Sequence, residues 1–358
     1  MSPRPRVAVV FGGRSPEHSI SCLTAAGVAA VIDPRDYDLV MVGVTRKGEW
    51  VVGDDPSAMA TPGPDGLPEV SRGDDGRELH VPGQPPRELT QVDVVLPLLH
   101  GAYGEDGTLQ GLLEFADVRY VGSGVLASAV AMDKDVMKTL LAAAGVPICR
   151  WVTLTARQWQ THPEAVTAQV GELGWPVFVK PSRAGSSFGI TKVSSADDLP
   201  AAIAHATAFD PKVIVEEAVV GREVECGVLE GVDGAPAQVS VLGEVLVGGD
   251  HDFYDFEAKY TDADALELVI PAVVEHGVTE QLARLAPTAF AALCCEGLAR
   301  VDFFLTDDGE LVLNEVNTMP GFTPSSMFPR VWAASGLDYP ALVDRLLRTA
   351  LSRPLGLR

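Results

Sequence analysis

Near the end of the chain, two carboxylates have the types and the spacing of a divalent-cation site. The segment ARVDFFLTDDGELVLNEVN (299–317) holds Asp308-Gly309 between two apolar runs, which is a strong signal for a hairpin with a two-residue turn. That turn would place Asp302 directly opposite Glu315. Facing carboxylates repel each other and destabilise a strand pair, and a bound cation would remove this penalty.

The same hairpin adds an amide and a guanidinium to this face. A two-residue turn also places Arg300 opposite Asn317, and residues two apart on a strand share a face. Carboxylate and amide oxygens suit Mg²⁺, which keeps part of its shell for water and substrate phosphates. Arg300 would stand beside the ion, where it could hold an anionic intermediate. The alternative is that these side chains form only the polar outer face of an edge hairpin.

A glycine- and serine-rich loop in the middle of the chain has the ingredients of a phosphate cradle. The stretch VKPSRAGSSFG covers residues 179–189. In a P-loop the lysine follows the glycines and opens a helix, whereas here Lys180 ends a strand and the strand-like ITKV follows Gly189. We therefore expect a hairpin whose tip covers phosphates with backbone N–H groups while Lys180 reaches in from the strand. The alternative is an ordinary exposed hairpin tip.

Strand and helix signals alternate along the chain in a way that would position these groups. The pattern predicts an α/β protein that begins with a parallel sheet. Residues 53–88, rich in Pro, Gly and Asp, read as a surface excursion. The expected strands cover 6–11, 39–45, 92–99, 118–122, 175–180, 189–193, 212–219, 222–230, 299–306 and 311–317. The expected helices cover 19–32, 108–115, 128–144, 164–173, 196–207 and 278–297.

The composition fits a small-molecule enzyme and argues against polyanionic partners. The chain has 358 residues, 47% of them hydrophobic, and 27 basic residues against 49 carboxylates. An acidic surface field repels nucleic acid and anionic membranes. No stretch reaches the ~18 apolar residues of a membrane span, and the start lacks a signal-peptide core. We therefore expect a cytoplasmic protein, and the loop and the hairpin together predict an enzyme that uses Mg·ATP without a P-loop.

Several stretches, in order and spread over nearly the whole chain, make the sequence resemble the D-alanine–D-alanine ligases of the ATP-grasp superfamily. The resemblance implies an α/β protein of the α+β ATP-grasp type with three domains, which we expect at 1–122, 123–220 and 221–358. ATP would lie between the last two. The matching stretches are VFGGRSPEHSIS (10–21), LHGAYGEDGTLQG (99–111), MDKDVMK (132–138), VKPSRAGSSFGITKV (179–193), VEEAVVGREVE (215–225), FYDFEAKY (253–260), ARVDFF (299–304) and NEVNTMPGFTPSSMFP (314–329).

The resemblance also implies which residues bind ATP and metal. The lysines on the α- and β-phosphates would be Lys134 and Lys180, and Lys259 would lie nearer the γ-phosphate. The lid would offer backbone donors from Ser187, Phe188 and Gly189. The adenine and ribose contacts would be Glu216, Glu217, Val219 and Glu223. The ligands of two Mg²⁺ ions, for which Mn²⁺ can substitute, would be Asp302, Glu315 and Asn317.

The amino-acid site follows from the same resemblance. Glu17 would fix the ammonium of the first D-alanine, and Ser326 would hold the carboxylate of the second. Arg300 and the backbone N–H of Gly321 would form the oxyanion hole. Tyr260 would hydrogen-bond toward the lid residue Ser186 and, through it, toward Glu17. For His100 we leave open whether it contacts substrate or is structural, and we expect His18 to pack or hydrogen-bond locally.

The implied reaction joins two D-alanines through a D-alanyl phosphate for a peptidoglycan precursor, in an enzyme that is a homodimer by the same resemblance. The first carboxylate would attack the γ-phosphate of ATP, and the second amine would then displace phosphate. Two alternatives stay open. One is the same fold with D-lactate or D-serine as acceptor, and the tyrosine at position 260 argues against it. The other is a non-catalytic ATP-binding sensor, for which a complete set of metal and phosphate residues has no use.

Overall fold

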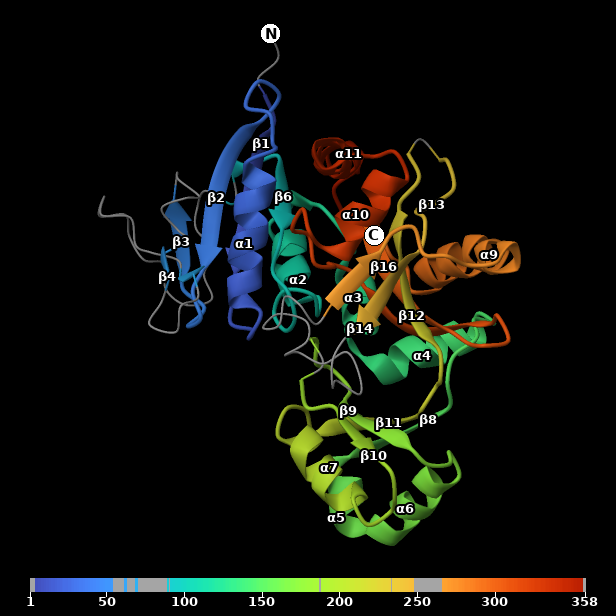
Figure 1. Ribbon diagram of the computed structural model, residues 1–358. Coiled ribbons are helices and arrows are strands. Elements are labelled where there is room, and N and C mark those ends of the chain that lie inside the picture. The colour runs from blue at the N-terminus through green and yellow to red at the C-terminus, as the bar shows by residue number, and fades with distance from the viewer. Residues whose placement is uncertain are drawn as a thin grey trace.

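The computed structural model describes most of the chain as three sheets with their helices (Figure 1). The described residues are 4–53, 61–62, 68–69, 89, 91–186, 188–232, 234–247 and 266–356. Ser187, Lys259, Tyr260 and most of the 53–90 excursion therefore lie outside the described residues. Within the described part of the chain, no helix is long and apolar enough to cross a membrane.

The first sheet is largely parallel, as predicted, and lies at the left of Figure 1. Its central strand β1 (Arg6–Gly12) pairs in parallel with β2 (Asp38–Val44) and β6 (Val94–Pro97). The valines of β1 are fully buried because apolar clusters cover the sheet on both faces. The sheet has the order β3-β2-β1-β6-β7, and its other elements are β3 (Trp50–Gly53), β7 (Arg119–Tyr120), α1 (His18–Ala29) and α2 (Thr108–Phe115). A short pair, β4 (Thr61–Pro62) and β5 (Pro68–Glu69), stands apart from it.

The second sheet is antiparallel and carries the glycine-rich loop. It forms the lower unit in Figure 1, with its helices on one side. Strand β9 (Val177–Pro181) pairs antiparallel with β10 (Thr191–Val193), Val179 opposite Thr191. The predicted strand–loop–strand unit is therefore confirmed. The sheet has the order β10-β9-β11-β8, and its other elements are β8 (Trp151–Thr155), β11 (Lys212–Glu217), α5 (Ala156–Thr161), α6 (Pro163–Gly171) and α7 (Leu199–Thr207).

The third sheet carries the predicted hairpin. It is antiparallel, with α9 (His276–Ala292) on one face. Helices α10 (Met327–Ala334) and α11 (Tyr339–Ser352) share one apolar core with the first sheet and fill the space between the two sheets (Figure 1). The sheet has the order β15-β14-β12-β16-β17, with β13 beside β12, and its strands are β12 (Arg222–Leu229), β13 (Gln238–Val239), β14 (Gly243–Val247), β15 (Leu266–Val269), β16 (Leu298–Leu305) and β17 (Leu311–Asn317).

The single helix predicted over 128–144 is wrong, because the structure has two helices there. Helix α3 (Val125–Met132) ends before Asp133, and α4 (Lys134–Ala143) begins after it. Asp133 has an extended backbone (φ −88°, ψ 99°), and its side chain accepts a hydrogen bond from the N–H of Val136. This is the geometry of an N-cap, which satisfies one of the donors that a new helix leaves free. The break sets the direction of α4 and of Lys134 at its start.

The predicted register of the hairpin is confirmed, but the two-residue turn is wrong. Asp302 pairs with Glu315, and Arg300 pairs with Asn317. The turn itself holds three residues, because Thr306 pairs with Glu310 through a 3.0 Å backbone hydrogen bond. A bulge next to Asp302 then inserts one extra residue into β17 and shifts the register back. The register shift caused by the longer turn and the shift caused by the bulge therefore cancel at Asp302.

Gly309 allows the three-residue turn, and its replacement tests this turn. Its φ of +83° lies in the left-handed region, and a Cβ there would meet no atom within 4 Å. We expect Gly309→Ala to lower the free energy of unfolding by ~1 kcal/mol through backbone strain alone. The matched control is Gly277→Ala in α9, where a Cβ also meets nothing and alanine should stabilise the helix. Urea unfolding of both variants checks this, and equal stability of the two would contradict the turn.

Candidate active site

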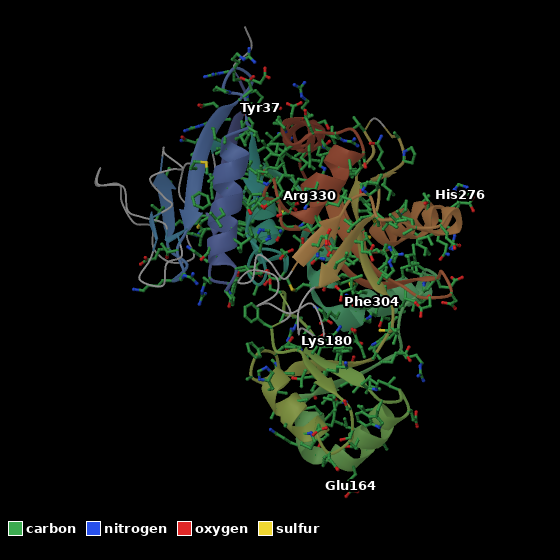
Figure 2. The ribbon with its side chains drawn as sticks, in the orientation of Figure 1. Tyr37, Glu164, Lys180, His276, Phe304 and Arg330 are labelled. Carbon is green, nitrogen blue, oxygen red and sulfur yellow. The ribbon has the colours of Figure 1, made fainter. Side chains whose placement is uncertain are left out.

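A cavity of about 290 Å³ separates the second sheet from the third. Figure 2 labels Lys180 and Phe304 on its two sides, the first on β9 and the second on β16. Most of the predicted ATP and metal residues line this cavity. They are Lys134, Lys180, Glu216, Glu217, Val219, Glu223, Asp302 and Glu315, and the predicted catalytic residue Ser186 lines it too. Residues far apart in sequence thus converge on one cavity, while the other described site residues are outside its lining: Glu17, Phe188, Gly189, Arg300, Asn317, Gly321 and Ser326.

Two lysines stand at the end of the cavity that the glycine-rich loop covers. Lys134 donates through Nζ to the carbonyl of Ala184, at 2.9 Å, and its Nζ lies 3.7 Å from Glu315 Oε2. It therefore joins α4, the loop and the third sheet. Lys180 projects from β9 into the same space and is almost buried, at 9% exposure. Partly desolvated ammonium groups suit phosphate oxygens.

Lys180 is held by a buried carboxylate that a second lysine shares. Glu216 Oε2 accepts from Lys180 Nζ at 2.7 Å, and Glu216 Oε1 lies 3.3 Å from Lys138 Nζ. Burial raises the pKa of Glu216, but Lys138 and Lys180 outweigh it and lower the pKa to about 2. Lys138 is fully buried and also donates to Cys149 Sγ at 3.2 Å. Sequence reasoning missed Lys138, although it follows Lys134 by one helical turn.

The remaining predicted nucleoside contacts line the cavity near Glu216. Glu217 accepts from the backbone N–H and from Nε of Arg150, at 2.6 and 2.7 Å. Val219 and Glu223 follow in the connection to β12 and on that strand. The group offers carboxylate acceptors beside an apolar side chain, which suits hydroxyls and a purine ring.

Three carboxylates lie side by side across the third sheet. Glu225 on β12 pairs with Asp302 on β16, and Asp302 pairs with Glu315 on β17. Glu225 is 5% and Asp302 7% exposed. Sequence reasoning missed the place of Glu225 in this row, although strand alternation puts it on the same face as Glu223. The row therefore holds three carboxylates where the sequence predicted only two, Asp302 and Glu315.

Arg300 neutralises part of this row. Its guanidinium donates to both oxygens of Asp302 at 2.7 Å, and its Nε lies 2.9 Å from Glu225 Oε2. Burial disfavours its charge, yet Asp302 and Glu225 raise the pKa of Arg300 well above its usual range. Asn317 donates to Asp302 Oδ2 at 3.0 Å. Arg300 and Asn317 therefore extend the face of the hairpin as predicted.

The donor set fits a magnesium site that is completed by substrate. Asp302, Glu315 and Asn317 supply only hard oxygen ligands, and their surplus of negative charge favours a divalent cation. Within the described residues, no three Asp, Glu, His or Cys side chains converge as a ready metal cage. Mg²⁺ itself is commonly held by a few carboxylates together with phosphate and water. When bound, the ion would supply charge neutralisation at transferring phosphate oxygens.

The glycine-rich loop reaches the first sheet's loops through Ser186. Its Oγ donates to Glu17 Oε1 in a short hydrogen bond, and its φ is +49°. Phe188 stacks on Phe209 with ring centroids 6.5 Å apart. Gly189 has a φ of +72°, and a Cβ there would lie 2.7 Å from the Phe209 ring. The loop therefore lies over the cavity between α7 and Glu17, as a phosphate lid would.

Two further groups, the buried His100 and the partly buried Glu105, join the loops of the first and third sheets. His100 Nδ1 lies 3.1 Å from the carbonyl of Met319, and burial lowers its pKa. Glu105, which sequence reasoning missed, accepts from the N–H of Gly101 at 2.5 Å and from that of Met319 at 3.3 Å. Burial and then Glu17 raise the pKa of Glu105 to about 8. His18 bonds the carbonyl of Gly13 at 2.8 Å, so its expected local role is confirmed.

Gly321 and Ser326 lie together on the loop before α10. Ser326 Oγ accepts from the N–H of Thr323 at 3.1 Å and lies 2.7 Å from Thr323 Oγ1. A Cβ on Gly321 would be 3.3 Å from that Oγ. The same loop carries Met319, which His100 and Glu105 hold. The loop is thus fixed against the first sheet's residues 100–105.

Comparisons with known proteins decide the family. The chain matches "D-ala D-ala ligase N-terminus" over residues 6–123 and "D-ala D-ala ligase C-terminus" over residues 140–348. The chain belongs to the D-alanine–D-alanine ligase family. Its D-alanine–D-alanine ligase relative from Kineococcus radiotolerans is 56% identical over 99% of both chains, and that from Mycobacterium bovis is 53% identical over 99% of this chain and 97% of the relative.

Solved structures agree with this assignment. A D-alanine–D-alanine ligase from Coxiella burnetii has a TM-score of 0.80 at 33% identity, covering 98% of this chain and 94% of the other. The VanG D-Ala:D-Ser ligase from Enterococcus faecalis also has a TM-score of 0.80 at 33% identity, covering 97% and 100%. The predicted α/β fold of the ATP-grasp type is confirmed.

The buried charges around Glu216 generate a stability prediction for this family member. We expect Glu216→Gln to lower the free energy of unfolding by ~3–5 kcal/mol at neutral pH, because two buried ammonium groups lose their partner. Glu216 has a folded pKa below its unfolded value, so its contribution is present above about pH 4.5 and is lost as the pH falls toward 2. The difference between wild type and variant should therefore shrink on acidification.

Denaturant unfolding at pH 7 and pH 3 measures this difference. The control is Glu216→Gln combined with Lys138→Met, which removes one of the two unpaired charges and should recover part of the loss. A difference that stays constant between the two pH values would contradict the ion-pair interpretation.

Proposed function

We propose that this chain joins two D-alanines at the cavity between the second and third sheets, with the residue roles predicted from its sequence. The family assignment supports ATP-dependent D-alanine–D-alanine ligation. The single observation that carries the residue assignment is the convergence of Lys134, Lys180 and the Asp302–Glu315 pair on one cavity. The product, by this proposal, is a precursor of peptidoglycan.

In the first step, the carboxylate of one D-alanine attacks the γ-phosphate of ATP and gives D-alanyl phosphate and ADP. Lys134 and Lys180 hold the α- and β-phosphates, and Glu216, Glu217, Val219 and Glu223 hold the nucleoside. Lys259 would assist at the γ-phosphate. Asp302, Glu315 and Asn317 would hold the two magnesium ions. Glu17 fixes the ammonium of the first D-alanine and so orients its carboxylate.

In the second step, the neutral amine of another D-alanine attacks the acyl carbon and phosphate leaves. Arg300 and the N–H of Gly321 stabilise the oxyanion that forms on the acyl oxygen. Ser326 holds the carboxylate of the second D-alanine. Because D-alanyl phosphate hydrolyses in water, the loop over the cavity must exclude solvent during both steps. The Ser186–Glu17 hydrogen bond ties that loop to the amino-acid site.

An experiment must identify the acceptor substrate, because ligases of this fold use different acceptors. The solved D-Ala:D-Ser ligase resembles this chain as closely as the solved D-Ala–D-Ala ligase does. D-alanine is favoured because relatives at 56% and 53% identity carry the D-alanine–D-alanine ligase name. We expect purified enzyme with ATP and D-alanine to form D-alanyl-D-alanine when D-lactate and D-serine compete at equal concentration.

Mass spectrometry of the products at several pH values makes the measurement. Little D-alanyl-D-alanine at neutral pH, with D-alanyl-D-lactate or D-alanyl-D-serine formed instead, would favour the alternative acceptors. A lack of D-alanine-dependent phosphate release from folded, Mg·ATP-saturated protein would instead favour the sensor.

The metal assignment generates a second prediction. We expect Asp302→Asn to lower turnover by more than ~100-fold, which exceeds the ~10–100-fold cost of losing an outer partner of a metal ligand. The fold should remain, because Glu225 still pairs with Arg300. Glu310→Gln, at the exposed tip of the same hairpin, is the matched control and should keep full turnover. Near-normal activity of Asp302→Asn would rule out the site.

Three further assignments remain predictions of this proposal. Exposed apolar side chains gather on α2 and α3, with Phe115 at 94% and Leu126 at 62% exposure, and a homodimer would cover such a surface. We expect the enzyme to act in the cytoplasm, where its proposed substrate ATP is available. Manganese would substitute for magnesium, because both accept carboxylate oxygens.

A further inference from the structure

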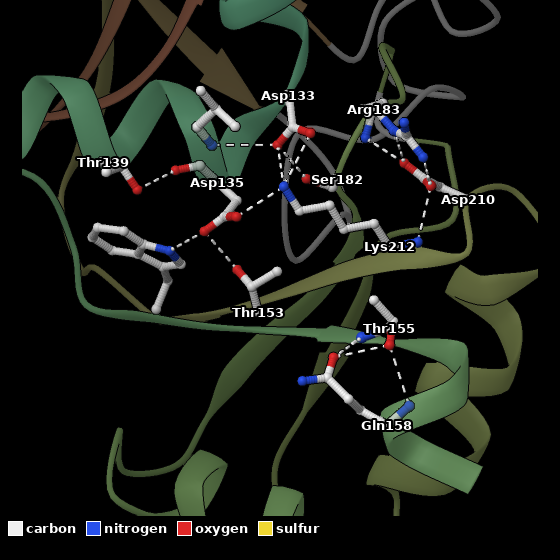
Figure 3. Close-up of polar contacts among 12 residues, drawn as sticks. Asp133, Asp135, Thr139, Thr153, Thr155, Gln158, Ser182, Arg183, Asp210 and Lys212 are labelled. Atoms are coloured by element: carbon white, nitrogen blue, oxygen red, sulfur yellow. Dashed lines mark hydrogen bonds and ion pairs between the residues drawn. The ribbon is translucent and has the colours of Figure 1, made fainter. Parts of the chain in front are cut away.

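Lys212, which has no assigned role in the reaction, holds two aspartates at the start of β11. Its Nζ lies 2.8 and 3.0 Å from the two oxygens of Asp133 and 2.8 Å from Asp135 Oδ2. Figure 3 shows this ammonium between the two carboxylates. The three side chains are only 14–26% exposed. Ion pairs at this depth are stronger than exposed ones, which contribute little.

The two aspartates flank Lys134 in the sequence and fix its backbone. Asp133 caps α4 and also accepts from Ser182 Oγ at 3.0 Å. Asp135 accepts from Trp151 Nε1 at 3.0 Å and from Thr153 Oγ1 at 2.9 Å, both on β8 (Figure 3). The start of α4 is therefore bound to β8 and β11 of the second sheet.

The backbone closes the same connection. The N–H of Lys134 donates to the carbonyl of Ser182 at 3.0 Å, and the N–H of Ser182 donates to the carbonyl of Lys212 at 2.9 Å. Ser182 directly follows β9 and begins the phosphate loop. One lysine thus joins the helix that carries Lys134 to the strand and loop that carry Lys180.

The charges agree with this arrangement. Burial lowers and the two aspartates raise the pKa of Lys212, and the net direction is upward. Burial raises the pKa of Asp135, but hydrogen bonds from Lys212, Trp151 and Thr153 lower it overall. Without Lys212, two carboxylates would face each other across the first turn of α4 and repel.

We propose that Lys212 is a positioning residue for nucleotide binding: it holds Asp133 and Asp135 together, and so directs Lys134 into the cavity between the second and third sheets. This rests on the proposed function in taking ATP as the ligand of Lys134. Lys212 itself is absent from the lining of the cavity, so its effect must pass through α4. The direction of Lys134 matters because a displaced ammonium loses most of a charge-assisted contact.

The test is the affinity of the enzyme for Mg·AMP-PNP, measured by titration calorimetry without D-alanine. We expect Lys212→Met to weaken binding roughly tenfold, the loss of about one charged hydrogen bond. The KM for ATP should rise by a similar factor, while kcat and the KM for D-alanine stay within about twofold because their residues keep their places. Lys212→Arg, which keeps the charge between the aspartates, should recover most of the affinity.

A double-mutant cycle separates positioning from general destabilisation. In the background of Lys134→Ala, adding Lys212→Met should change AMP-PNP affinity by less than about twofold, because coupled residues are not additive. Arg345→Met is the matched control: it removes a cation bonded to Gln238 Oε1 and the carbonyl of Glu230, away from the cavity, and should leave affinity unchanged.

Unchanged affinity in Lys212→Met, or full additivity with Lys134→Ala, would overturn the proposal. If Lys212→Met does not fold, the same measurements on Lys212→Met combined with Asp135→Asn, which removes one of the facing charges, decide it. Dipeptide synthesis by the wild-type enzyme reports separately on the proposed function. Its absence would leave the nucleotide measurements intact.

Discussion

The row of Glu225, Asp302 and Glu315 sets the constraint on which the rest of the site depends. Three neighbouring carboxylates on one sheet face, two of them nearly buried, are stable only if cations stand beside them. Arg300 supplies one positive charge from within the sheet, and Lys134 approaches Glu315 from α4. Together they leave the row short of positive charge. That deficit is what suits the site to a divalent cation with its nucleotide.

Where α4 packs beside the second sheet the imbalance is reversed, and buried cations outnumber carboxylates. Lys138 and Lys180 share one carboxylate, Glu216, so the pair keeps a net positive charge next to the cavity. Lys180 of this pair and all three carboxylates of the row line the same cavity of about 290 Å³. A polyphosphate bound to a metal ion carries both negative and positive charge. Its phosphates can pair with the lysines, and its metal ion can pair with the carboxylates. The protein as a whole has a net charge of −22, so anion binding depends on this local reversal.

The hairpin shows how far sequence reasoning can reach. The turn signal at Asp308-Gly309 and strand alternation were enough to predict Asp302 opposite Glu315 on one face, and the structure has this pair. The turn was wrong by one residue, and a bulge that the pattern does not announce restored the register. The register at the site was still right, because the extra turn residue and the bulge offset each other before Asp302.

The contacts that sequence reasoning missed are those between distant segments. No glycine or proline marks the break between α3 and α4 at Asp133. Part of what stabilises the break is the hydrogen bond from the N–H of Lys134 to the carbonyl of Ser182, which follows β9 of the second sheet. Lys138 and Glu225 looked like ordinary members of a helix and a strand until Glu216 and Arg300 came beside them. Family resemblance supplied the roles of residues that already matched a motif. The resemblance gave no role to Lys212, because the role depends on contacts between distant segments. The two aspartates that Lys212 binds flank Lys134 in the sequence. Their other partners lie on β8 and in the lid loop, so the role of Lys212 arises only where α4, β8, β11 and that loop meet.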